Sequence, residues 1–329
     1  MSVFIATLSP MLTLFLCIAA GFIFTKTKIL PESSGKVMAK METWIFCPAL
    51  NFMTMVRYCT VDTISDHAIN VTLATFGVLV ALAIAIPLSR MFAKKNTDEN
   101  GIYSYALTFG NSGYMGDPIV LALFGEAALA YYKLYCLPIS LVIYTWGISV
   151  LTPKSAQNGA AWKRLLNAPT VATVAGMILG LSGLGNHLPD FLIGSMDSLK
   201  ACMGPVAMLI AGACIARYDL VKMLKKKKVY IATAFRLVVL PILILAALFG
   251  AKELLGSLLG IKIGNEVLFL SFFATGTPLG LNTVVFPEAY GGDSETGAGM
   301  AMISHTLCII SIPILYSVIT AVFGTPFAG

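Results

Sequence analysis

The stretch "FGNSGYMGDPIV", residues 109–120, interrupts a long hydrophobic segment of the chain. It holds three glycines, an asparagine, an aspartate and a proline, while the residues on both sides are mainly apolar. Glycine weakens a helix and proline removes one of its backbone donors. The break therefore needs surroundings that satisfy the freed backbone groups.

The composition of the chain indicates that these surroundings lie in a membrane. Of its 329 residues 57% are hydrophobic and 12% are charged, and the mean hydropathy is +0.85. Soluble domains carry about 25% charged residues, and one membrane-spanning helix needs roughly 20 apolar residues. We predict an all-α integral membrane protein with ten transmembrane helices. The predicted spans are 3–25, 37–56, 68–90, 101–124, 129–151, 167–184, 192–216, 229–250, 266–287 and 297–322.

The basic residues predict the orientation of these spans. With the N-terminus outside, sixteen Lys and Arg residues fall in inward loops and three, Arg57, Lys252 and Lys262, fall outside. Cytoplasmic loops are enriched in Lys and Arg. The bias predicts a multi-pass protein of the cell membrane with both termini outside. It also explains the net charge of +6 without a nucleic-acid partner.

A hydrophilic connection at 152–166 divides the spans into five and five. An odd number of spans per half inverts the second repeat, 167–329, relative to the first, 1–151. Breaks recur at matching positions: Gly and Pro interrupt the fourth span as "GNSGYMGDP" and the ninth as "ATGTPLGLNT". Paired interruptions in two inverted halves are typical of a transporter site near the bilayer midplane.

Each break contains a sequence that suits the start of a half-helix. Asp117 has the side chain of an N-cap and Pro118 suits the first helical position. Thr277 and Pro278 repeat this arrangement in the ninth span. Two half-helices would then direct their positive N-terminal ends to the membrane centre, which favours an anion. The predicted crossover and cap residues are Gly116, Asp117, Pro118, Gly276, Pro278 and Gly280.

At these residues the chain resembles the auxin efflux carrier family, which includes plant PIN-type carriers. Asn111, Gly116 and Pro118 match the family's N-x-x-x-x-G-x-P crossover, and the ninth and tenth spans carry further matches at Pro278, Gly280, Phe286, Tyr290 and Pro313. The resemblance implies crossed broken helices in spans 4 and 9, similar to NhaA and the bile-acid symporters. It also implies alternating-access transport of a small organic anion, auxin-like or a mono- or dicarboxylate. The chain departs from the family pattern at Asp117, at Gly110, where PIN-type carriers have proline, and at Asn282.

Polar side chains at the breaks are the candidates for contact with the cargo. Asn111 lies mid-membrane, where its amide needs a partner in the backbone or in a ligand. Asn51 either lines the same cavity or forms a bond between helices. The predicted substrate-binding residues are Asn111, Ser112, Gly113, Asn51, Thr275, Thr277 and Asn282.

The residues that could couple transport to an ion have alternative interpretations. Asp117 and His305 are candidates for coupling to Na⁺ or H⁺, while a capping role for Asp117 and a packing role for His305 are the alternatives. Arg236 is expected to snorkel to the basic inner boundary. The seven cysteines are scattered, so we predict no metal site and no other cofactor.

Two other classes of protein compete with a transporter. The strings at Pro48–Leu50, Gly116–Asp117 and Tyr218–Asp219 imitate an intramembrane aspartyl protease, but in reversed order and without its G-x-G-D motif. We therefore expect no enzyme. A non-transporting receptor on a transporter scaffold is the other alternative. The expected partners are an organic anion and membrane lipid, and a homodimer is left open.

Overall fold

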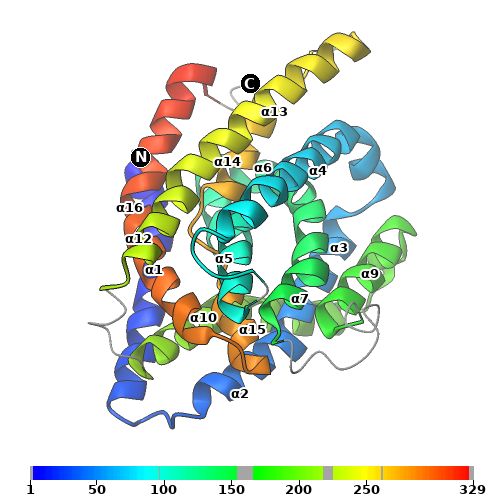
Figure 1. The fold of residues 1–329 in the computed structure, drawn as a ribbon. Helices are drawn as coiled ribbons and strands as arrows, with labels where there is room; N and C mark the ends of the chain where they lie inside the picture. The colour runs from blue at the N-terminus through cyan, green and yellow to red at the C-terminus, as the bar shows by residue number, and fades with distance from the viewer. Residues whose placement is uncertain (1–2, 96, 154–165, 218–224, 261, 326–329) are drawn as a thin grey trace.

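The computed structural model describes residues 3–95, 97–153, 166–217, 225–260 and 262–325 (Figure 1). Within them the chain is helical, and no strand is present. The first part contains α1 (Val3–Lys26), α2 (Ser34–Met41), η1 (Glu42–Phe46), α3 (Cys47–Tyr58), α4 (Val61–Ser89), α5 (Asp98–Thr108), η2 (Ser112–Gly116), α6 (Asp117–Val142), η3 (Ile143–Gly147) and α7 (Ile148–Leu151). The second part contains α9 (Ala168–Leu181), η5 (Leu184–His187), α10 (Asp190–Arg217), α12 (Lys227–Ala234), η6 (Phe235–Val239), α13 (Leu240–Leu259), α14 (Glu266–Thr275), α15 (Asn282–Tyr290) and α16 (Ser294–Phe323).

Several of these elements join into longer rods. The π-helical turns η1, η3 and η6 continue the helices before and after them without a break. Gly125, with φ of +81°, instead bends α6. This left-handed conformation is open to glycine, so α6 turns between Phe124 and Glu126.

Five helical segments in the described residues are long and apolar enough to cross a membrane. They are Ala68–Ser89, Ala128–Leu151, Asp190–Arg217, Lys227–Leu259 and Ser294–Phe323. Shorter apolar helices include Phe15–Lys26, Ala168–Leu181 and Glu266–Thr275. The chain is therefore an all-helical, multi-pass membrane protein. The connection predicted at 152–166 lies mostly outside the described residues, which exclude 154–165.

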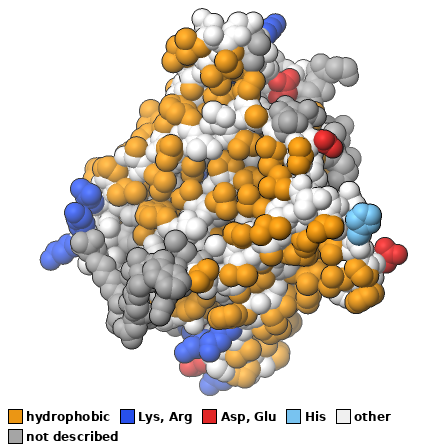
Figure 2. Space-filling view, turned by 90° about the vertical axis from the view of Figure 1, so that its right-hand side faces the viewer, with side chains coloured by type: hydrophobic (Ala, Val, Ile, Leu, Met, Phe, Trp, Pro, Cys, Tyr) orange, Lys and Arg blue, Asp and Glu red, His pale blue; other side chains and the backbone are white. Residues whose placement is uncertain are grey.

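The outer surface suits a lipid environment. Large apolar side chains such as Leu16 (71% exposed), Phe191 (76%) and Leu258 (74%) face outward. Figure 2 shows hydrophobic side chains across much of one face, with charged side chains near its margins. Lipid-facing residues have no reason to be polar, whereas a soluble protein rarely exposes so large an apolar patch.

Close helix contacts depend on small residues. A Cβ added at Gly21 of α1 would meet the Leu209 carbonyl oxygen at 2.2 Å, and one at Gly212 of α10 would meet the Ile18 oxygen at 2.0 Å. Gly176 of α9 packs in the same way on α3. Membrane helices associate through such small residues because lipid offers little hydrophobic driving force between them.

Basic residues from several loops gather at one end of the helix bundle. Lys26 Nζ donates to the Ala216 carbonyl and Lys228 Nζ donates to the Phe92 carbonyl. Arg217 and Lys226 form ion pairs with Glu288 and Glu295. The C-terminal ends of α1, α4, α10 and α15 therefore lie at this end of the bundle.

Candidate functional site

The two interruptions meet each other in an antiparallel crossing. After α5 ends at Thr108 the chain is extended, and the Asn111 amide donates to the Pro278 carbonyl over 2.7 Å. The Gly280 amide donates to the Phe109 carbonyl over 3.2 Å, and Gly110 pairs with Leu279. These bonds satisfy backbone groups that broken helices would otherwise leave free in the membrane. We call residues 109–111 together with 277–280 the crossing.

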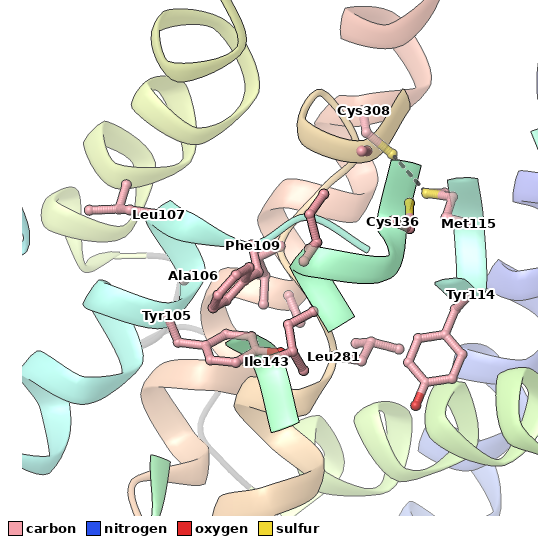
Figure 3. Packing of buried hydrophobic residues seen from close by; sticks show 14 of the residues in the cluster. Tyr105, Ala106, Leu107, Phe109, Tyr114, Met115, Cys136, Ile143, Leu281 and Cys308 are labelled. Carbon is pink, nitrogen blue, oxygen red and sulfur yellow. Dashed lines mark hydrogen bonds between the residues drawn. The ribbon is translucent and has the colours of Figure 1, made fainter. Parts of the chain in front are cut away.

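Apolar side chains pack around the crossing. Figure 3 shows Tyr105, Phe109 and Ile143 beside Leu281, with Tyr114 further along η2. The Tyr105 and Phe109 rings lie 4.9 Å apart. The polar backbone of the crossing is thus enclosed by protein and kept from lipid.

The starts of the half-helices differ from the prediction. The first begins at Ser112, before Asp117 and Pro118, because the Asn111 carbonyl already accepts the amides of Met115 and Gly116 at 3.1 Å. The second begins at Asn282 and not at Pro278. The reason is that residues 278–280 are held extended by their bonds to the first break. The predicted caps therefore serve other purposes.

Asp117 forms an ion pair with Lys133 of the same bent helix. The described hydrogen bonds of its carboxylate contain no bond to a helix amide, so the predicted N-cap is wrong. Both side chains are largely buried, 18% and 8% exposed. Lys200 lies within electrostatic range of both groups. Both ammonium groups act on the Asp117 carboxylate, and Asp197 also acts on Lys200.

Lys133 was missed by the sequence reasoning. A signal existed, because a lysine inside the apolar segment 129–151 is expensive in a bilayer and commonly functional. The positive-inside count, which considers loops, passes over such a residue.

A cavity of about 60 Å³ lies beside the crossing. Of the predicted substrate-binding residues, Asn51, Asn111, Ser112, Gly113 and Asn282 line it, together with Asp117, Lys133 and Gly280. Thr275 and Thr277 do not line it, nor do Gly116, Gly276, Pro278 or His305. Gly113 is exposed, and a Cβ added there would meet nothing within 4 Å. The cavity region is therefore open at Gly113.

Asn111 is held by His305 of α16. Its amide nitrogen lies 3.0 Å from His305 Nε2, and His305 Nδ1 lies 2.8 Å from the Ala301 carbonyl oxygen. A carbonyl only accepts, so Nδ1 carries the proton and Nε2 accepts from Asn111. The Asn111 side-chain oxygen is buried and has no partner in the described residues. Asn111 thus lines the cavity and carries a buried acceptor atom without a partner in the described residues.

Other predicted residues make structural bonds. Asn51 donates to Thr173 over 3.0 Å and to the Pro169 carbonyl, which joins α3 to α9. Asn282 donates to the Tyr105 hydroxyl over 2.8 Å. The Thr275 hydroxyl donates to the Ser271 carbonyl.

Tyr132 links the first break to α14. Its hydroxyl lies 3.2 Å from the Ser112 carbonyl oxygen and 3.1 Å from that of Phe273. A Cβ at Gly116 would meet this hydroxyl at 2.1 Å. Gly116 therefore provides space for Tyr132.

A buried carboxylate also lies near the cavity. Glu42 of η1 is 1% exposed, and the Tyr114 hydroxyl donates to its Oε1 over 3.0 Å. Its Oε2 has no partner among the described residues. The sequence reasoning missed this residue too, although an acid inside span 37–56 stands out for the same reason as Lys133.

The fold and the crossing define a class, the multi-pass helical membrane proteins with two interrupted helices that meet at a polar cavity. Residues 6–316 match the profile of the family described as "Membrane transport protein", so the chain belongs to this family, the auxin efflux carrier family expected from its motifs. Membership of a transporter family points away from an enzyme. Asp219, needed for the protease alternative, lies outside the described residues.

Two relatives match over most of their length. An uncharacterized transporter of Methanocaldococcus jannaschii is 22% identical over 308 residues, which cover 92% of this chain and 95% of the relative. A protein of Rhizobium meliloti with the name "Putative malonate transporter" is 26% identical over 298 residues, 87% of this chain and 88% of the relative.

Proposed function

We propose that this protein is a secondary transporter that moves a small organic anion by alternating access around the crossing. The observation that carries the proposal is the cavity beside the crossing, where Lys133 and Asn111 offer an ammonium group and an unpartnered acceptor. Lys200 adds a second ammonium group that acts on Asp117. Ammonium groups in a largely buried site attract an anion.

The chemistry of the cavity favours a particular kind of anion. The ammonium of Lys133 suits a carboxylate, whereas the Asn111 oxygen requires a hydrogen-bond donor. A hydroxy acid or a half-protonated dicarboxylic acid carries both groups. The malonate in the name of the Rhizobium meliloti relative supports a dicarboxylate, and the small cavity favours a short one.

The proposed architecture is ten spans in two inverted repeats, 1–151 and 167–329, joined by the connection at 152–166. Contacts between helices support it. In one pair, α1 (span 1) packs extensively on α10 (span 7). In the matching pair, α9 (span 6) packs on α3 (span 2). Likewise α4 contacts α5 as α13 contacts α14. Two inverted repeats produce such exchanged pairs. The charge bias of the loops supports termini outside the cell membrane.

We further propose that Asp117 takes part in coupling. A cargo carboxylate can bind Lys133 fully only when that ammonium loosens from Asp117. Protonation of Asp117 would release it, so cargo and proton would move together. His305 contributes indirectly, through the orientation of Asn111.

The test uses purified full-length protein. Thermal unfolding is measured with malonate, succinate, lactate, acetate and chloride, because a ligand that binds the folded state raises its stability. Uptake of the best labelled ligand into proteoliposomes follows. We expect a small carboxylate to stabilise the protein and to be taken up. Stabilisation without uptake would indicate a receptor, and no response to any carboxylate would refute the proposed cargo class.

A further inference from the structure

Arg236 is a fully buried cation that faces the crossing. The sequence predicted that it snorkels to the inner boundary, but it is 0% exposed, so that expectation is wrong. Its Nη2 donates to the Thr277 carbonyl over 3.1 Å, and its Nη1 lies 3.5 Å from the Leu107 carbonyl oxygen. Arg236 lies in the π-helical turn η6, and such turns are frequent at functional sites.

The charge of Arg236 is not balanced by an acid. None of the ion pairs found within 4.0 Å in the described residues includes it. A guanidinium keeps its proton in proteins, and an uncompensated buried charge is strongly unfavourable. The groups that compensate it must therefore be the carbonyls to which it donates.

One of those carbonyls belongs to the end of a broken helix and the other to the crossing. Leu107 lies in the last turn of α5, and Thr277 lies two residues beyond the last residue of α14. The last carbonyls of a helix lack intrahelical donors and carry about half a negative charge together. Arg236 thus bridges the negative end of α5 and the unwound segment that follows α14.

The crossing provides the space for this guanidinium. A Cβ added at Gly110 would meet Arg236 Nη2 at 2.3 Å and Thr277 Oγ1 at 2.5 Å. Gly110 stands where PIN-type carriers have proline, and here any side chain would collide with the arginine. The glycine and the buried arginine therefore belong to one arrangement.

We propose that Arg236 is the resident counter-ion of the crossing, in the place that sodium takes in carriers whose unwound carbonyls coordinate it. The crossing then needs no Na⁺. This inference rests on the proposed transport function and deepens it, because it removes sodium at the crossing from the coupling choices. Arg236 acts as a positioning residue, since it does not line the cavity.

The experiment measures thermal unfolding of the purified full-length protein in sodium chloride and in choline chloride at equal ionic strength. The variants are Arg236→Lys, which keeps a charge, and Arg236→Met, which removes it. The control is Lys252→Met, which removes the charge of another buried cation, 6% exposed. Lys252 lies in α13, away from the crossing, and its ammonium donates to the Asn265 side chain. Stability is read without cargo, so failure of the cargo proposal would appear separately, in the carboxylate panel.

We expect equal midpoints in both salts for the native protein and for Arg236→Lys. Arg236→Met should unfold at a lower temperature in choline and recover part of the loss in sodium, because the ion can enter the vacated carbonyl site. Lys252→Met should lose stability in both salts alike. A higher unfolding midpoint of the native protein in sodium than in choline would overturn the proposal. An Arg236→Met variant with the native midpoint in both salts would overturn it too. If Arg236→Met does not fold, the comparison of the native protein and Arg236→Lys in the two salts still decides.

Discussion

The Asn111 side-chain nitrogen and His305 Nε2 lie 3.0 Å apart, although 194 residues separate them. Because His305 Nδ1 is engaged by the Ala301 carbonyl, the ring can only accept from Asn111. The amide oxygen of Asn111 is thereby directed away from the histidine. His305 on α16 thus fixes the orientation of the Asn111 amide in the first break.

Asn111→Ala should retain the fold and lower cargo affinity by about tenfold or more, since a lost buried hydrogen bond costs about 1–3 kcal/mol. His305→Phe should weaken binding less, because it only frees the amide to rotate. In the double variant the His305 substitution should add little. Cargo-dependent thermal shifts measure all three, and fully additive losses would contradict this coupling.

Asn51 also lines the cavity, but its amide nitrogen is engaged elsewhere. This amide joins α3 to α9 through Thr173, so Asn51→Ala should lower the unfolding temperature while cargo affinity stays close to native. A large loss of affinity with unchanged stability would instead return Asn51 to the cargo site.

Variants of the Asp117–Lys133 pair separate the effect of the pair on stability from its effect on anion binding. Lys133→Met should be strongly destabilising, by about 3–5 kcal/mol, because it leaves a buried carboxylate unpaired. Asp117→Asn together with Lys133→Met should recover stability without recovering anion binding. Denaturation of the three variants and the carboxylate panel measure these effects.

Asp117→Asn alone tests coupling in proteoliposomes. If Asp117 carries the proton, exchange of cargo should continue while uptake against a gradient, driven by a pH difference, is lost. Native concentrative uptake with its original pH dependence would reduce Asp117 to a structural partner of Lys133.

Two glycines of η2 should respond differently to alanine. Gly116→Ala places a methyl group 2.1 Å from the Tyr132 hydroxyl and should cost about 1–3 kcal/mol through overpacking. Gly113→Ala meets no atom within 4 Å and should leave stability almost unchanged. Adding Tyr132→Phe to Gly116→Ala should restore part of the loss, and equal unfolding midpoints for both alanine variants would show that the contact does not matter.

Orientation can be measured with cysteines introduced at Asp62 and Lys95, both exposed. The background should lack Cys202, the exposed native thiol. The charge bias predicts that a membrane-impermeant maleimide labels position 62 in intact cells and position 95 after permeabilisation. The reverse pattern would place both termini inside.

Composition and local sequence determined the class of this protein. Apolar segments of helical length cannot be stable in water, and "GNSGYMGDP" with "ATGTPLGLNT" can be stable in a membrane only where protein satisfies the freed backbone. These patterns predicted a helical membrane protein of the auxin efflux carrier family, and both statements agree with the described fold and the family match.

Tertiary structure decided which groups pair. The partners of Asp117, Asn111 and Arg236 lie 16, 194 and 41 or 129 residues away. Local cap rules assigned Asp117 to a helix end, and distance from a loop assigned Arg236 to the boundary, because both rules consider only neighbours in the sequence. A buried charge is stabilised by whatever group the fold brings near it, and the crossing of the two broken helices supplied those groups.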